Sequence, residues 1–151
     1  MAAGLSVKIC EIDAFRQKIN EYAKEHKSEL RTDAPEYVDA EIPLSAITME
    51  TLLAMEAMAP FGKENLRPRF MATNVGLASA PRPLNSSGGV QFVFYQNGVT
   101  ANGVAFQHPS WASDFVNTGS QMFDIVFQPS INRFAGRTSV QLKLIDWQSR
   151  E

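Results

Sequence analysis

The sequence has a single cysteine, Cys10, and only two histidines among its 151 residues. One thiol excludes a disulfide framework within the chain and a zinc site built on cysteines. No apolar run approaches the roughly 20 residues that a membrane-spanning helix needs. The N-terminus also lacks a secretory hydrophobic segment. We therefore expect a cytoplasmic protein with no membrane partner.

Hydrolytic and phosphate-binding motifs are also missing. There is no Gly-x-Ser-x-Gly, no glycine-rich phosphate loop and no cysteine–histidine pair, and His26 and His108 each stand without a second ligand. Asp39 and Glu41 would project from one face of a predicted strand and could hold a divalent metal; the alternative is a solvated acidic face. We expect that the chain alone is not an enzyme, with no catalytic and no metal-binding residue.

Charge is unevenly distributed along the chain. Residues 1–60 carry 6 Lys and Arg against 11 Asp and Glu, a net −5, whereas residues 61–151 carry 8 against 5, a net +3. A mildly basic surface has the sign expected where a protein meets phosphate. By charge alone, a random distribution of charged residues is the simpler explanation of the difference between the two halves.

The acidic half combines strand-like and helix-like patterns. We expect a strand over residues 4–9, a helix capped by Asp13 and ending near residue 26, a polar connection over residues 27–36 and a strand over residues 37–42. Thr48 is typical of a helix N-cap, and Glu50 suits a first turn. The helix that follows is apolar on most sides, so it is expected to be buried between two layers.

A turn separates the two halves. Pro60 disfavours helix at the residue before it, Gly62 permits a bend and Pro68 stiffens the exit. We expect residues 1–59 to be the small α/β end of an incomplete domain, residues 60–68 a connecting turn and residues 69–151 a second domain.

The second half has the alternating rhythm of β-strands. Strands are predicted over residues 69–78, 90–95, 99–106, 122–128 and 138–147, with a helix over residues 109–117 and loops over residues 81–89 and 129–137. Asn97-Gly98 is typical of a type I′ hairpin turn, and Gly103 indicates a bulge or bend. Three strands, a helix and two strands is the order of an OB-fold, a five-stranded Greek-key barrel. The expected fold class is therefore α+β.

A family resemblance is carried by residues 2–5, 38–42, 59–65 and 132–137, in this order. These stretches resemble RecJ-type single-strand-specific exonucleases. Residues 2–5 are similar to those after the Gly-Gly-His motif of the family's DHH-associated domain. Residues 38–42 and 59–65 resemble the segment that leads into its OB domain, and residues 132–137, with Val140-Gln141-Leu142 and Asp146, resemble the last hairpin of that domain. The run from Lys63 to Pro68 and the pair Val90-Gln91 depart from the family pattern, and the family's Asp-His-His and Gly-Gly-His motifs are absent.

The resemblance implies a chain that starts just past the catalytic residues of such an enzyme. Its function would be that of a single-stranded DNA binding module of a 5′→3′ exonuclease in DNA repair and recombination, with the catalytic centre outside this chain. Mn²⁺ or Mg²⁺ is implied for the full-length enzyme and no cofactor for this chain. The implied partners are single-stranded DNA, the remainder of the parent exonuclease and other repair proteins.

OB-folds hold single strands on their second and third strands and on the loops after the first and fourth, where cations meet phosphates and flat side chains stack on bases. The residues expected there are Arg82, Gln91, Tyr95, Arg133, Phe134, Arg137 and Lys143. Phe92 and Phe94 share a face and suit a barrel core equally well, and Phe134 could be a buried loop anchor. The rival function is a structural or protein-docking OB module without direct nucleic-acid binding, which the modest positive charge favours.

Overall fold

The computed structural model describes residues 4–26, 36–84, 88–134 and 136–150. The chain divides into two compact units, Met1–Glu36 and Tyr37–Glu151. None of the helices within the described residues is long and apolar enough to span a bilayer.

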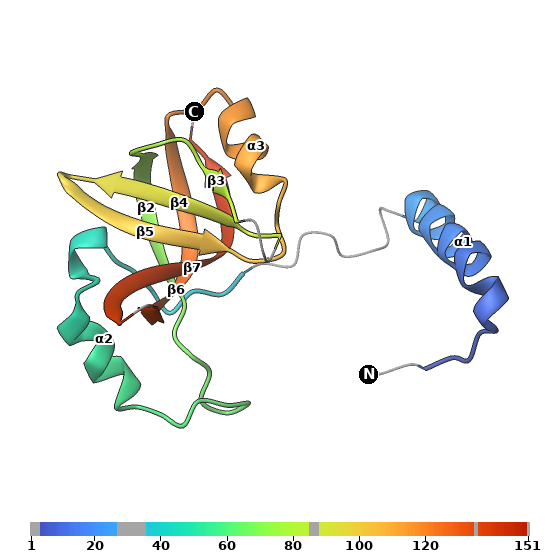
Figure 1. Cartoon of the computed structure of the whole chain (residues 1–151), viewed down its shortest axis with the longest axis horizontal. Coiled ribbons are helices and arrows are strands. Elements are labelled where there is room, and N and C mark those ends of the chain that lie inside the picture. The colour runs from blue at the N-terminus through green and yellow to red at the C-terminus, as the bar shows by residue number, and fades with distance from the viewer. Residues whose placement is uncertain (1–3, 27–35, 85–87, 135, 151) are drawn as a thin grey trace. The chain divides into compact units, whose positions relative to one another are not determined.

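The first unit is built on one helix. A short 3₁₀ turn, η1 (Ile9–Glu11), leads into α1 (Ile12–Glu25) (Figure 1). The predicted strand over residues 4–9 is wrong, because no partner strand stands beside it among the described residues of this unit. Asp13 is not the N-cap either, since Glu11 takes that position and Asp13 pairs with Arg16 at 2.9 Å. No residue of α1 is buried within the unit.

The second unit is a ring of five strands. Its members are β2 (Phe70–Leu77), β4 (Val90–Gln96), β5 (Val99–Ala105), β6 (Met122–Phe134) and β7 (Arg137–Ser149). β2 pairs with both β4 and β6, and the pairings β6–β7, β7–β5 and β5–β4 complete the ring. All are antiparallel except the parallel pair β5–β7. This arrangement is an OB-fold, and the expected α+β class is confirmed.

Two short strands extend this sheet at its margins. β1 (Ala40–Glu41) runs parallel to β2, and β3 (Arg82–Pro83) runs antiparallel to β4. β3 therefore lies within the stretch expected to be a loop, and it adds its backbone to the sheet next to β4.

The barrel core is aromatic. The rings of Phe92 and Phe94 are fully buried, and Phe115 of α3 (Trp111–Asn117) packs on them from one end of the barrel. Trp147 stacks on Phe115 with ring centroids 3.9 Å apart. Leu44 of the 3₁₀ turn η2 (Leu44–Ala46) enters the same core and is 2% exposed.

The compact unit therefore begins well before the turn at Pro60. Leu44 donates its backbone N–H to Gln96 Oε1 at 2.8 Å, and Gln96 Nε2 donates to the carbonyl of Thr73 at 2.7 Å, which ties η2 to β2 and β4. The assignment of residues 1–59 to an incomplete neighbouring domain stays a prediction, whereas the unit that holds the barrel starts at Tyr37.

α2 (Met49–Glu56) packs beside β6 and β7. Thr48 is its N-cap, as predicted, because its hydroxyl accepts from the backbone N–H of Thr51 at 3.1 Å. The expected burial between two layers is wrong. Only Leu52 and Met55 are buried, while Leu53 on the other side of the helix is 54% exposed.

The type I′ turn predicted at Asn97-Gly98 is confirmed, whereas the bulge or bend predicted at Gly103 in β5 is wrong. Asn97 and Gly98 have φ of 49° and 81°, as a type I′ turn requires. Gly103 lies in regular register opposite Phe92, so no bulge forms there. A Cβ at Gly103 would lie 2.7 Å from Phe94 Cε2 and 2.9 Å from Leu144 Cδ1, so this glycine allows close packing inside the barrel.

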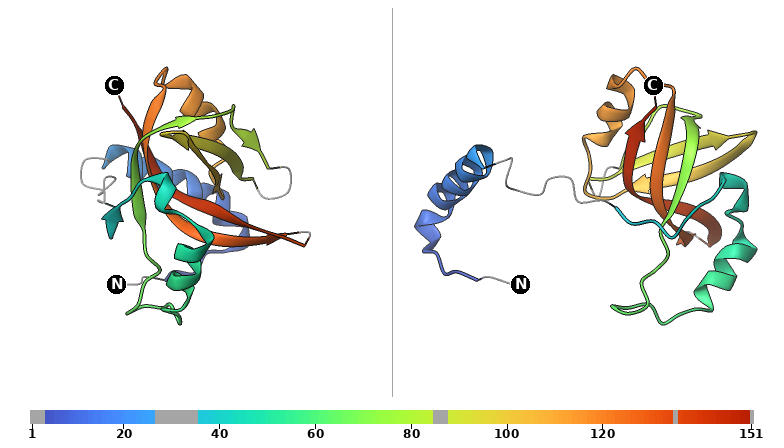
Figure 2. Two further views of the ribbon diagram at one scale, coloured as in Figure 1. Left: turned by 90° about the vertical axis from the view of Figure 1, so that its left-hand side faces the viewer. Right: turned by 180° about the vertical axis from the view of Figure 1, so that it is seen from behind.

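The β6–β7 hairpin is much longer than predicted. The expected loop over residues 129–137 is wrong, because both strands run for 13 residues and Pro129 pairs with the buried Leu142. Pairing of β6 with β2 ends at Phe127. Beyond that point β6 has β7 as its only described strand partner, and an edge of this kind tolerates proline. Figure 2 shows the hairpin projecting past the barrel.

Candidate nucleic-acid interface

Arg82, Gln91 and Lys143 lie in one row across the barrel. The register pairs Arg82 with Gln91, Gln91 with Val104, and Val104 with Lys143. Directly paired residues project from the same face of a sheet. These three polar side chains therefore share the outer face of β3, β4 and β7. Val104 of β5, which lies between Gln91 and Lys143, is buried. The row continues to Gln128 of β6.

Tyr95 belongs to the same outer face. It lies four positions after Gln91 on β4, and side chains alternate with a period of two. Its ring lies over Gly76 of β2, where a Cβ would come within 2.1 Å of Tyr95 Cε1. The residue keeps 40% of its surface exposed. Phe92 and Phe94, by contrast, point inward and are core, which removes them as stacking residues.

Phe134 lies at the tip of the β6–β7 hairpin. It is 78% exposed and pairs with Arg137, so a buried loop anchor is wrong. By strand alternation, Phe134 and Arg137 share the face of Lys143, whereas Arg133 projects from the opposite face. In the left view of Figure 2, β3 and this hairpin project on the same side of the barrel. We call the surface formed by these outward-facing side chains the strand face, after the single DNA strand expected there. It consists of the side chains of Arg82, Gln91, Tyr95, Phe134, Arg137 and Lys143.

Although they project from opposite faces of the hairpin, Arg133 and Lys143 both line a pocket between α2 and the hairpin. This pocket has a volume of about 280 Å³ and is lined by Leu53, Glu56, Arg67, Ser130, Ile131, Arg133 and Lys143. Arg67 Nη1 lies 2.6 Å from Glu56 Oε1, and its guanidinium lies 4.4 Å from the centre of the Phe61 ring. Sequence reasoning missed Arg67, because it stands in the turn before β2 and no local spacing links it to Glu56.

The electrostatics of the pocket follow from this pairing. The hydrogen bond from Arg67 is the largest effect and holds the pKa of Glu56 below its ordinary value. Burial opposes it, and the positive charges of Arg67, Arg133 and Lys143 each lower the pKa by a smaller amount. Glu56 is therefore a carboxylate in a positive field.

Asp39 and Glu41 each accept a hydrogen bond that links the β1 segment to β2 or to the residue before it. Asp39 Oδ2 accepts from the backbone N–H of Arg69 at 2.9 Å, and Glu41 Oε1 accepts from the Thr73 hydroxyl at 2.6 Å. Within the described part of the chain, no group of three or more His, Cys, Asp or Glu side chains is placed to hold a metal. The donors that the described residues supply therefore do not match a Mn²⁺ or Mg²⁺ site.

Comparison with known proteins places this fold in a family. A family model described as the RecJ OB domain matches residues 38–146. The chain is 26% identical over 146 residues to the single-stranded-DNA-specific exonuclease RecJ of Bacillus subtilis (strain 168), covering 97% of this chain and 18% of that protein.

Two solved structures share the fold. Crystal structures of RecJ from Thermus thermophilus, in complex with Mn²⁺ and with Mg²⁺, both match with a TM-score of 0.56, at 16% and 15% identity. The matches cover 98% and 97% of this chain, and 20% and 21% of those chains. The chain thus spans about a fifth of the length of these relatives. With the family model matched over most of its length, the chain belongs to the RecJ OB domain family.

Proposed function

We propose that this chain is a single-stranded DNA binding module of a RecJ-type exonuclease. The observation that carries the proposal is the strand face, on which Arg82, Gln91 and Lys143 form one row across the barrel. Exposed aromatic rings, Tyr95 on β4 and Phe134 at the hairpin tip, share the outer face with this row. Cations for the backbone combined with flat rings for the bases are what single-strand binding surfaces use.

The dimensions of the row suit a short stretch of single strand. Neighbouring strands lie about 4.8 Å apart, so the row from β3 to β7 spans roughly 14 Å. A DNA strand rises about 3.4 Å per stacked nucleotide, so roughly four nucleotides fit along the row. That number lies at the lower end of the range of about 4–16 nucleotides for one OB-fold.

The parent enzyme's chemistry would take place elsewhere. We propose that the strand face holds the DNA while a catalytic centre outside this chain, with its Mn²⁺ or Mg²⁺ ions, cleaves it in the 5′→3′ direction. Cytoplasmic DNA repair and recombination is the setting that the family resemblance implies.

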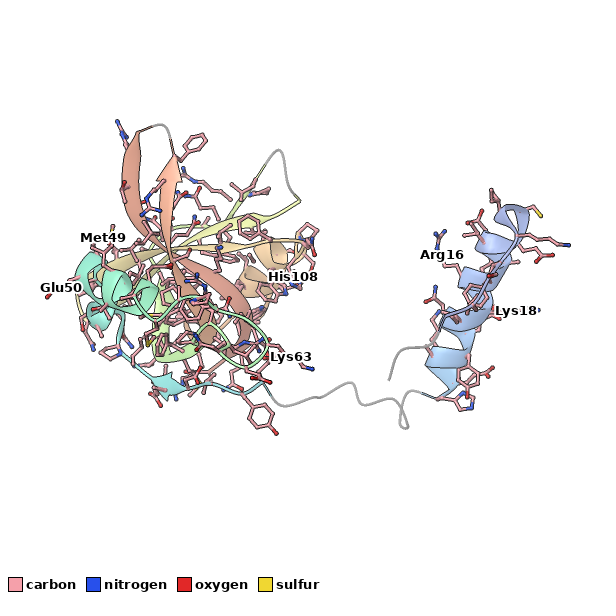
Figure 3. The ribbon with its side chains drawn as sticks, turned by 90° about the horizontal axis from the view of Figure 1, so that it is seen from below. Arg16, Lys18, Met49, Glu50, Lys63 and His108 are labelled. Carbon is pink, nitrogen blue, oxygen red and sulfur yellow. The ribbon has the colours of Figure 1, made fainter. Side chains whose placement is uncertain are left out.

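A titration tests the proposal. Labelled oligo-dT and a duplex of the same length are titrated with the 151-residue chain at several salt concentrations. We expect preference for the single strand, and a slope of log K against log [salt] of about −0.7 for each phosphate contacted. Arg82→Ala should reduce that slope by about one contact, while Lys63→Ala, an exposed cation in the turn outside the strand face, should leave it unchanged (Figure 3).

The same titration separates the rival function. Equal affinity for duplex and single strand, or no binding at low salt, would favour a structural or protein-docking OB module.

A further inference from the structure

The pocket between α2 and the hairpin carries an inference of its own. It gathers three cations, Arg67, Arg133 and Lys143, around one carboxylate, Glu56. We propose that this pocket binds a phosphate of the DNA backbone, and that Glu56 competes with that phosphate for Arg67. This inference rests on the proposed single-strand binding and adds to it a second contact site with a built-in competitor.

Charge balance favours an anion as ligand. With all four groups ionised the pocket carries a net charge of +2, and among the described residues only Arg67 of the three cations has an ion-pair partner within 4 Å. Arg133 and Lys143 therefore contribute positive charge that Glu56 does not neutralise.

Arg67 is already oriented for such a ligand. Its guanidinium is fixed between the Glu56 carboxylate at 2.6 Å and the Phe61 ring at 4.4 Å, and the side chain remains 32% exposed. A planar guanidinium with several fixed donors matches the oxygens of a phosphate as well as those of a carboxylate. A phosphate that displaces Glu56 thus finds its donors in place.

The position of the pocket favours a nucleic acid over an acidic protein segment. Lys143 belongs both to the pocket and to the row of the strand face. The next residue in that row, Gln128, donates its side-chain amide to the carbonyl of Arg67 at 3.3 Å. Single-stranded DNA that follows the row from β3 to β7 therefore arrives at the pocket, because Lys143 belongs to both.

Competition by Glu56 has a functional consequence. When DNA enters the pocket, Arg67 gives up the Glu56 carboxylate for a DNA phosphate. Part of the electrostatic gain of binding DNA is therefore lost, and the DNA backbone is bound weakly. Weak binding suits single-stranded DNA that must move through the protein.

The test compares two substitutions of equal charge on one helix. Glu56→Gln removes the competitor, and Glu50→Gln makes the same charge change at an exposed position of α2 that points away from the barrel (Figure 3). With labelled oligo-dT of about 15 nucleotides, within the site size of one OB-fold, we expect Glu56→Gln to lower the Kd by roughly two- to fivefold, the range of one exposed ion pair. Glu50→Gln should leave the Kd unchanged.

Arg67→Gln provides the complementary measurement. It should raise the Kd and reduce the magnitude of the salt slope by about 0.7, the value of one phosphate contact on a single strand. Thermal melts of each variant accompany the titrations, because a purely structural ion pair would lower Tm in Glu56→Gln without tightening DNA binding.

The outcomes are distinct. If the unaltered chain does not bind oligo-dT, the proposed function fails. If it binds but Glu56→Gln and Glu50→Gln behave alike, the pocket inference fails and the proposed function stands. If an oligo-glutamate peptide of matched charge displaces the DNA as effectively as unlabelled oligo-dT does, the pocket is a site for acidic protein segments and the inference is overturned.

Discussion

The Phe134 side chain is the most exposed aromatic of the strand face, and this decides what its removal should do. Phe134→Ala should weaken oligo-dT binding by about 1–3 kcal/mol, the value of one base-stacking contact. The salt slope should stay the same because no charge is lost. Since the ring is 78% exposed, Tm should change little.

Tyr37→Ala is the matched control for this measurement, because Tyr37 is 81% exposed and lies outside the strand face. It should bind as the unaltered chain does. A large drop in Tm for Phe134→Ala, with DNA affinity intact, would show that the ring supports the hairpin and does not stack on bases.

Asp124 is a buried carboxylate whose charge stabilises the fold. Burial alone would raise its pKa, but hydrogen bonds from the Asn74 backbone N–H, Gln148 and Arg150, together with the charge of Arg150, outweigh that effect and hold the pKa below the ordinary 3.8. Arg150 Nε lies 2.6 Å from Asp124 Oδ1, and this ion pair ties the end of the chain to β6. The residue is 6% exposed.

Stability should therefore depend on this group in acid. Because the pKa of Asp124 is lower in the folded state than the ordinary 3.8, its carboxylate stabilises the fold fully at pH values about one unit or more above 3.8. This stabilisation is lost as the pH falls through the folded-state pKa. Asp124→Asn should lower the free energy of unfolding by about 1–3 kcal/mol at pH 7. Urea unfolding of both proteins between pH 7 and pH 3 should show this difference shrinking in acid, and a difference that grows in acid would contradict the assignment.

At the scale of the elements, alternation and turn chemistry predicted most of the barrel. The Asn97-Gly98 turn and the strands on either side follow from local sequence. The length of the β6–β7 hairpin did not, because Pro129 and its polar neighbours have the composition of a loop. The hairpin continues because β7 pairs with β6 along its full length, which is a tertiary effect.

Gly103 was predicted to mark a bulge because glycine inside a strand often does, but its role is to allow close packing inside the barrel. Gly103→Ala should destabilise the protein by about 1–3 kcal/mol through overpacking, because the new methyl group meets the Phe94 ring and Leu144. Gly62→Ala is the control: no atom lies within 4 Å of its added Cβ. Equal Tm values for the two variants would mean that the barrel interior has room at Gly103.

The candidate site was predictable only in part. Alternation along single strands placed Gln91, Tyr95 and Lys143 outward. The row that joins Arg82 to Lys143 depends on the parallel pairing of β5 with β7, two strands far apart in sequence, which no local pattern specifies. Arg133 was expected beside Phe134, and the alternation of a continuous strand turns it to the opposite face.

For the whole molecule, the folding unit should be larger than the barrel strands alone. A fragment of residues 37–151 should unfold cooperatively with a Tm close to that of the full chain, because it contains η2 and α2. A fragment of residues 67–151 loses Leu44 from the core, and burial of one leucine contributes about 2–5 kcal/mol. Equal stability of the two fragments, measured by urea unfolding, would place the boundary at the turn after all.

The central claim, that the strand face holds single-stranded DNA, is tested most directly by NMR. Oligo-dT is added to the ¹⁵N-labelled chain at low salt, and the shifts of the backbone amides are mapped onto the barrel. We expect shifts concentrated at Arg82, Gln91, Tyr95, Lys143 and the hairpin tip, with little change in α3 and β1. Shifts confined to α1 or α3, or no shift at all, would contradict the claim.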